Sequence, residues 1–130
     1  MEIDKPKIIQ DAGFDFAWDN EKVWKLEVPT TWMDISQLEW QFDLPFLDWA
    51  GGWYNLKPRD VIDHPGDYEA EYYRALQTDR IHPIDIMENH DRFFVLDGLH
   101  RLMKAAIDGK TKVPVRIIPR NLIPKILKDK

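Results

Sequence analysis

Residues 93–103, FFVLDGLHRLM, are the part of the sequence that constrains the fold most strongly. The apolar run over 93–96 is typical of a buried strand, and the glycine that follows allows a sharp turn. Leu99, Leu102, Met103 and Ala106 then recur at the spacing of one buried helix face. The pattern therefore predicts a strand, a tight turn and a helix over 98–108, which Gly109 ends in the position that favours glycine.

The predicted turn also carries the best candidate for a binding site. If the apolar helix face is buried, His100 and Arg101 point away from the core near the first helical turn. Free N–H groups at a helix start attract anions, and Gly98 lets a ligand approach the backbone closely. Arg101 can hold phosphate oxygens in a fork, and His100 can donate a further hydrogen bond. These features predict a phosphate site. A simpler explanation stays open, in which Asp97 is only a helix cap, His100 is a surface residue and Arg101 pairs with an acid of the front half of the chain.

The flanking sequence predicts a single α+β domain, with a small mixed sheet surrounded by helices. Strands are expected over 23–28, 84–87, 93–96 and 113–118, with the middle two joined as a hairpin by a longer loop over 88–92. Helices are expected from Asp34 to about Trp40, over 60–64 as one turn, and from Asp67 to near 79–80. We expect the domain to span 21–120, after an arm over 1–20 that packs only in part and before a basic helix or tail over 121–130.

Composition limits the classes of protein to which the chain can belong. The 130 residues are 44% apolar and 32% charged, which is typical of a globular domain. There is no cysteine, so disulfides, thiolate metal sites and cysteine nucleophiles are excluded. The N-terminus shows no signal peptide and no stretch is long enough to span a bilayer, so we expect a cytoplasmic protein without a membrane partner.

Charge is distributed unevenly along the chain, although the net value is only -5. Residues 1–70 carry 15 acids and 6 bases, whereas residues 100–130 carry 2 acids and 9 bases. The acidic front argues against a domain coated in nucleic acid, because duplex binding relies on neutralising phosphates. The basic end can still attract a small anion or a local stretch of nucleic acid, or it can simply be a solvated surface.

Six tryptophans lie within the first 53 residues: Trp18, Trp24, Trp32, Trp40, Trp49 and Trp53. We expect most of them in the core, because a small domain fills its interior efficiently with large rings. Trp24 is the surest core member, since it would lie on the apolar face of the strand over 23–28. Stacking on a base or burial by a partner protein are alternatives for the others.

The arrangement around the turn resembles the ParB/sulfiredoxin-like superfamily. The resemblance rests on HPIDI over 82–86, a hairpin, VLDGLHR over 95–101, a helix with alanines, and VPV over 113–115. It covers 81–118 well, 28–43 more loosely and much of 44–80 only in outline. In that superfamily the equivalent turn holds nucleotide phosphates: those of ATP in sulfiredoxins, CTP in ParB proteins and adenine nucleotide in free-serine kinases. The resemblance implies that Gly98, His100 and Arg101 contact the phosphates of ATP, ADP or CTP.

Departures from the family pattern narrow this expectation. Sulfiredoxins place a reactive cysteine directly before the His-Arg pair, where this chain has Leu99, so sulfinic-acid repair by that route is excluded. ParB proteins have a more arginine-rich turn and continue into a helix-turn-helix domain, which the residues up to Lys130 do not show. The turn is closest to that of free-serine kinases, in which an acid like Asp97 holds Mg²⁺ or takes the hydroxyl proton. Their second catalytic acid has only loose candidates here, Glu39 and Asp43.

The expected function is therefore nucleotide binding, with phosphotransferase or nucleotide-hydrolysing activity at Asp97 and Glu39 and with Mg²⁺ held by Asp97. The alternative is a non-enzymatic adaptor of the same fold, which binds a protein through the tryptophan-rich half or nucleic acid through the basic end. Nucleic acid is the less favoured partner because of the acidic front half. The four histidines fit no compact metal-binding motif.

Overall fold

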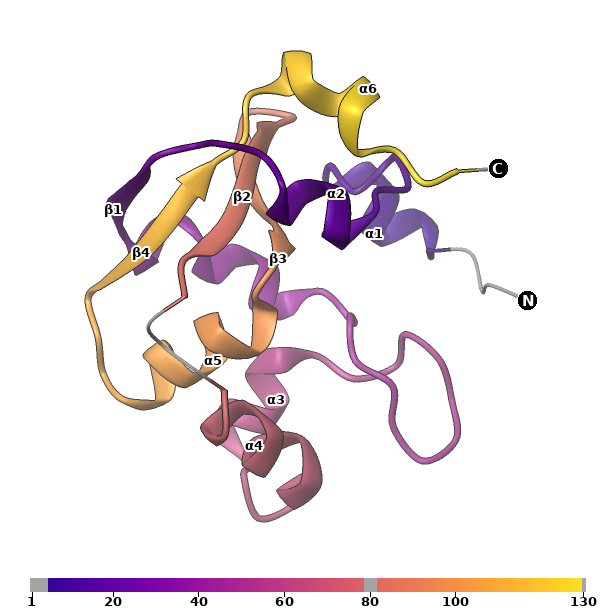
Figure 1. The fold of residues 1–130 in the computed structure, drawn as a ribbon. Helices are drawn as coiled ribbons and strands as arrows, with labels where there is room; N and C mark the ends of the chain where they lie inside the picture. Colours follow the sequence, from indigo (N-terminus) through magenta and orange to yellow (C-terminus); the bar gives the residue numbers. More distant parts are fainter. Residues whose placement is uncertain (1–4, 79–81, 130) are drawn as a thin grey trace.

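Four strands form one mixed sheet in the computed structural model, which describes residues 5–78 and 82–129 (Figure 1). Their order across the sheet is β1–β4–β2–β3. The two central strands pair in parallel, and each outer strand pairs antiparallel with its neighbour. The strands are β1 Thr30–Asp34, β2 Ile84–Asn89, β3 Arg92–Asp97 and β4 Lys112–Ile117. With the helices around it, this sheet confirms the predicted α+β fold.

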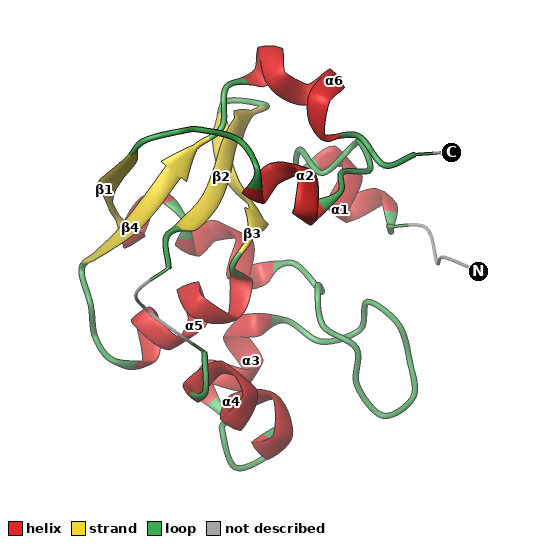
Figure 2. Cartoon of the chain, viewed as in Figure 1, coloured by secondary structure: helices red, strands yellow, loops and turns green. Residues whose placement is uncertain are grey.

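The sheet is covered on both faces, as Figure 2 shows. Along β3 the side chains alternate: Val95 joins one hydrophobic cluster, whereas Phe94 and Leu96 join the other. The first cluster lies under α3 (Pro58–Asp63), α4 (Glu69–Leu76) and α5 (Leu99–Ile107), the second under α1 (Lys7–Asp11), α2 (Asn20–Trp24) and α6 (Ile123–Ile126). Three 3₁₀ helices complete the fold: Ile35–Gln37, Glu39–Asp43 and Arg120–Leu122.

The outer strand β3 is protected by side chains along its free edge. The buried Gln41 accepts a hydrogen bond from the Val95 N–H at 2.9 Å and donates to the Leu38 carbonyl at 3.0 Å. The Trp40 indole donates to the Phe93 carbonyl at 3.1 Å, and the Trp18 indole donates to the Leu96 carbonyl at 3.0 Å. These contacts satisfy backbone groups that an exposed edge would leave open for pairing, and they hold the end of β3 where the candidate site begins.

The predicted strand over 23–28 was wrong. Asn20–Trp24 is a short helix, because the Asp19 side chain accepts the Glu21 N–H at 2.9 Å and so caps its start. The strand comes after Pro29, where none was predicted, and Thr30–Asp34 pairs with β4. Trp24 was wrong as a core residue for the same reason: on the helix its side chain is 57% exposed.

The hairpin was predicted correctly except for its loop. Glu88 and Asn89 still belong to β2 and Arg92 already belongs to β3, so the turn consists of His90 and Asp91 alone. Both have positive φ angles, 52° and 62°, as the common two-residue hairpin turn requires. The segment after Asp34 is helical as expected but forms two 3₁₀ turns, and Asp34 makes no capping hydrogen bond. The predicted turn of helix over 60–64 is present within α3, which begins earlier, at Pro58. The following helix was predicted from Asp67 to near 79–80, but α4 ends at Leu76, and Gln77 and Thr78 are not helical.

Both ends of the chain pack against the same side of the sheet. Ile9 and Phe14, from the segment expected to be an arm, are buried in the second cluster, where Ile126 of α6 joins them. Trp18 also forms an antiparallel bridge with Leu127, which ties the start of the chain to its end. Within the described ranges, no helix has the length and apolar character needed to cross a membrane.

Candidate functional site

Gly98 makes the turn between β3 and α5 possible. Its φ of 112° lies in the region that residues with a side chain rarely adopt. A Cβ at this position would lie 3.3 Å from two side-chain carbons of Ile84, so the strand beside it leaves little room. The helix that follows carries His100 and Arg101 in its first turn, while Leu102 and Met103 are buried, as the spacing predicted. The close packing of Gly98 on β2 therefore determines where these two side chains lie.

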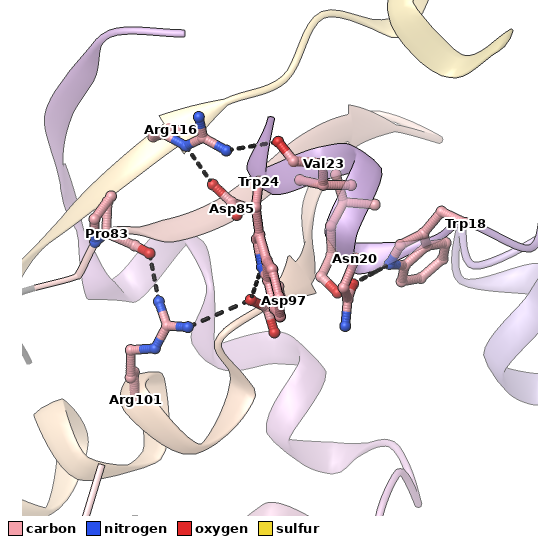
Figure 3. Close-up of polar contacts among 10 residues, drawn as sticks. Trp18, Asn20, Val23, Trp24, Pro83, Asp85, Asp97, Arg101 and Arg116 are labelled. Atoms are coloured by element: carbon pink, nitrogen blue, oxygen red, sulfur yellow. Dashed lines mark hydrogen bonds and ion pairs between the residues drawn. The ribbon is translucent and has the colours of Figure 1, made fainter. Parts of the chain in front are cut away.

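Asp97 is the carboxylate at the centre of this turn, as Figure 3 shows. Its Oδ2 accepts a hydrogen bond from the Trp24 indole at 2.6 Å and another from Arg101 at 3.3 Å. Arg101 also donates to the Pro83 carbonyl at 2.6 Å, so its guanidinium bridges the turn and the start of β2. Asp97 Oδ1 has no hydrogen-bond donor within the described part of the chain. One oxygen of this carboxylate thus remains available for a ligand.

His100 faces the neighbouring helix α4. Its Nε2 lies 3.0 Å from the Glu71 carboxylate, and both side chains are mostly buried, at 18% and 15% exposure. The other oxygen of Glu71 lies 3.8 Å from the Arg74 guanidinium. A phosphate at His100 would therefore have to replace Glu71 at Nε2 or bind the Nδ1–H. The sequence pattern indicated His100 but not Glu71, whose position depends on how α4 packs on α5.

A cleft of about 580 Å³ opens over this turn. Its polar lining includes four cationic or imidazole side chains (Lys5, Arg74, His100 and Arg101) and three carboxylates (Asp48, Glu71 and Asp97). Its aromatic lining consists of Phe14, Trp18, Phe46 and Tyr54. A second cavity, of about 1090 Å³, shares much of this aromatic wall and extends it towards Trp53. The volume of the first cleft is within the range of small-molecule sites, and its lining combines apolar rings with a few charged groups.

The structure brings together Asp97, Gly98, His100 and Arg101, but not Glu39. Glu39 does not line the cleft. Its backbone carbonyl accepts a hydrogen bond from Arg59 at 3.2 Å. The neighbouring Asp43 pairs with the same arginine at 2.6 Å. Besides Asp97, Glu71 is an acid that contacts a predicted phosphate residue, through His100. The described residues hold no group of three or more potential metal ligands, so a cation here would rest on one or two carboxylates and on ligand oxygens.

A second aspartate–arginine pair lies directly behind the turn. Asp85 is opposite Asp97 in the β2–β3 register, and its carboxylate accepts from Arg116 at 2.6 Å (Figure 3). Arg116 also donates to the carbonyls of Leu26 and Val23, at 2.7 and 2.9 Å, so it ties α2 to the sheet. Burial raises the pKa of Asp85 above 3.8, a change that Arg116 opposes and the charge of Asp97 reinforces. Because α2 carries Trp24, this pair also supports the indole that binds Asp97.

The raised pKa of Asp85 predicts a pH dependence of stability. The folded protein holds the Asp85 proton more tightly than the unfolded chain does, so raising the pH from below 3.8 through the folded-state pKa favours unfolding. We expect the stability of the wild type, relative to Asp85→Asn, to fall over that range and then to level off. Urea unfolding of both proteins across the range measures the difference. A relative stability that rises with pH would show that Arg116 outweighs burial.

Three of the six tryptophans are exposed rather than in the core. Trp24, Trp32 and Trp53 have exposures of 57%, 67% and 62%. Trp18, Trp40 and Trp49 pack against the hydrophobic clusters as partly buried residues. The expectation of core packing therefore holds for these three only. The exposed rings belong to different surfaces, since Trp53 lines the larger cavity and Trp32 lines a groove beside β1.

Comparison with known proteins adds no relative on which to base a function. No family model, no curated protein and no solved structure matches the chain.

Proposed function

We propose that the cleft over the β3–α5 turn binds a nucleoside polyphosphate, with the phosphates at the start of α5 and the base against the aromatic wall. The observation that carries the proposal is that one cleft is lined by His100 and by three permanently charged cations. These cations are Lys5, Arg74 and Arg101. Arginine side chains recognise phosphate oxygens through a planar fork, and the start of α5 adds backbone N–H groups. The resemblance of the turn to that of nucleotide-binding ParB/sulfiredoxin-like domains supports the same assignment.

The carboxylates of the cleft fit a ligand that arrives with Mg²⁺. A nucleotide carries its cation partly on its own phosphates and needs one or two further oxygens from the protein. Asp97 supplies one such oxygen, and Glu71 lies next to His100 on the same wall. Without a cation, these acids would repel the phosphates that the neighbouring arginines attract. Nucleotide binding is therefore expected to be stronger in the presence of Mg²⁺.

Phosphoryl transfer is the activity that this arrangement would support. Such reactions depend chiefly on holding the nucleotide and neutralising its charge, while a carboxylate orients the attacking hydroxyl or water and takes its proton. Asp97 is the residue proposed for this role, because it lies at the turn beside Arg101. When Asp97 acts in this way, Glu71 is the carboxylate that is left to hold Mg²⁺. A phosphotransferase and a nucleotide hydrolase share these requirements and differ in whether the attacking group belongs to an acceptor or to water.

A thermal-shift experiment tests the binding proposal. Wild-type protein is heated with ATP, ADP, CTP or GTP, each with and without Mg²⁺. A ligand at a hundredfold excess over its Kd stabilises the folded state by about 2.7 kcal/mol, which is readily detected as a rise in Tm. We expect a rise with at least one nucleotide, and a loss of most of that rise in Arg74→Ala and His100→Ala, since each charged contact contributes about 1.5–3 kcal/mol.

Lys57→Ala is the matched control for these variants. Lys57 is exposed, does not line the cleft and makes no capping hydrogen bond at the start of α3. The Lys57→Ala substitution removes one positive charge, as Arg74→Ala does, but leaves the site unchanged. The rise in Tm with nucleotide should therefore equal that of the wild type. No rise with any nucleotide, or equal rises in all variants, would reject the proposal.

A non-enzymatic adaptor is the second candidate, and the exposure of Trp53 favours it. The ring is 62% exposed and lines the larger cavity together with Trp18 and Tyr54. Exposed tryptophans are frequent anchors of protein interfaces. Two results together would favour the adaptor function: no nucleotide stabilises the protein, and Trp53→Ala abolishes the capture of a defined partner.

A further inference from the structure

A third cavity adjoins the nucleotide cleft at Thr78 and Arg101 and lies between α5 and the β1–β4 pair. It has a volume of about 550 Å³. Its described lining contains four permanently charged cations, Arg101, Lys104, Lys110 and Lys112, and no aspartate or glutamate. Trp32 forms one wall, and it is the most exposed large hydrophobic residue among those described. A basic groove with an exposed indole thus exists in a chain whose net charge is -5.

Among the described residues, no carboxylate forms an ion pair with any of the three lysines of this groove. Lys104 donates to the backbone carbonyl of Thr78 at 2.9 Å, which orients its ammonium group but leaves the charge. Lys110 and Lys112 form no ion pair with any described residue. Asp34 lies opposite Lys112 in the β1–β4 register, but it is outside the groove lining and more than hydrogen-bond distance from that lysine. The groove is therefore a region of positive potential.

The backbone that carries these side chains is well fixed. Gly109 follows α5 with a φ of 72°, and its N–H donates to the Ala106 carbonyl at 3.1 Å. The Lys110 N–H donates to the Ala105 carbonyl at 2.9 Å, which completes the hydrogen-bond pair of a Schellman motif. Lys112 begins β4, and Trp32 lies opposite Pro114 in the same strand pair. The cations and the indole thus belong to a preformed arrangement, which lowers the ordering cost of binding.

We infer that this groove binds single-stranded nucleic acid, with a base stacked on Trp32 and the adjoining phosphates against Lys104, Lys110 and Lys112. Single strands are held by a combination of an aromatic platform for the bases and a basic surface for the backbone. An acidic peptide would engage the lysines but would leave the indole without a flat partner. A duplex would bring many phosphates towards the acidic front half of the chain. A short single-stranded segment of nucleic acid would provide both a base to stack on Trp32 and phosphates to contact the lysines.

Fluorescence anisotropy with labelled oligothymidylate and oligouridylate tests this inference. We expect both to bind, because stacking and phosphate contacts are common to DNA and RNA. Trp32→Ala should weaken binding about tenfold. The double variant Lys110→Ala/Lys112→Ala should lower the slope of log K against log[salt] by about 1.4, which corresponds to two phosphate contacts of a single strand.

Two controls distinguish this groove from the rest of the surface. Trp53→Ala removes an exposed indole that lines the larger cavity, and Arg74→Ala removes a cation of the nucleotide cleft that does not line this groove. Both should bind the oligonucleotides as the wild type does, and Trp32→Ala should keep the nucleotide response described above. The inference is wrong if neither oligonucleotide binds, if Trp32→Ala has no effect, or if an oligoglutamate peptide competes as strongly as the nucleic acid.

Discussion

Replacing Arg116 by alanine is expected to lower the free energy of unfolding by about 3–5 kcal/mol, the range found when one partner of a buried ion pair is removed. The Asp85 carboxylate is only 5% exposed, so without Arg116 it would be a buried charge that has lost its hydrogen-bonded counter-ion. The substitution also removes the donors to the Leu26 and Val23 carbonyls that hold α2 on the sheet. Urea unfolding at neutral pH measures the loss. A change below about 1 kcal/mol, the size typical of exposed pairs, would contradict this account.

The double variant Asp85→Ala/Arg116→Ala measures the interaction energy between the two residues apart from their contacts with the rest of the protein. Once both charges are absent, no unpaired charge remains buried, so the double variant should be less destabilised than the sum of the two single variants. Arg74→Ala is a suitable control, since its side chain is 67% exposed, and its effect on stability should lie within about 0.5 kcal/mol. Additive single and double variants would show that the two residues do not stabilise each other.

Gly98→Ala is expected to destabilise the protein by about 2–4 kcal/mol, as the sum of backbone strain and overpacking. The φ of 112° is unfavourable for any residue with a Cβ, and that Cβ would press on Ile84 at 3.3 Å. A backbone shift that relieved the unfavourable φ or the contact with Ile84 would move the start of α5, and with it His100 and Arg101. Thermal unfolding measures the stability, and the nucleotide response should weaken in the same variant.

Gly109→Ala provides the control for the Gly98 prediction. Gly109 also has a positive φ, of 72°, but a Cβ there would meet no atom within 4 Å. Its substitution should therefore cost only the strain of the left-handed conformation, about 1 kcal/mol. Equal losses in the two variants would show that contact with Ile84 contributes nothing.

The sequence predicted the segment from β2 to β4 well because its patterns are unambiguous. The helix after Gly98 has one apolar face and a glycine at each end, so local chemistry and tertiary packing agree. The region over 23–34 was misread because its alternation of apolar and polar residues can be accommodated by more than one structure. The capping chemistry of Asp19 decides for a helix there, and the β-branched pair Thr30-Thr31 belongs to the strand that follows.

The candidate site could be predicted only in its local part. Asp97, His100 and Arg101 are neighbours along the chain, so their proximity follows from the turn and helix alone. Glu71, Arg74 and Lys5 come from distant segments, and their positions depend on how α4 and the N-terminal segment pack. Trp24 shows the same limit: its indole reaches Asp97 because α2 packs on the sheet through the buried Val23, whose carbonyl accepts from Arg116. No local pattern carries that information.

Phosphate binding at the start of α5 can be tested by backbone amide NMR during a titration with ATP and Mg²⁺, because each amide reports its own surroundings. We predict saturable shifts in the amides of Gly98, Leu99, His100 and Arg101, with smaller changes near Glu71, and no such shifts with adenosine alone at Leu99 and His100. Shifts confined to other parts of the chain, or identical shifts with adenosine, would contradict the claim.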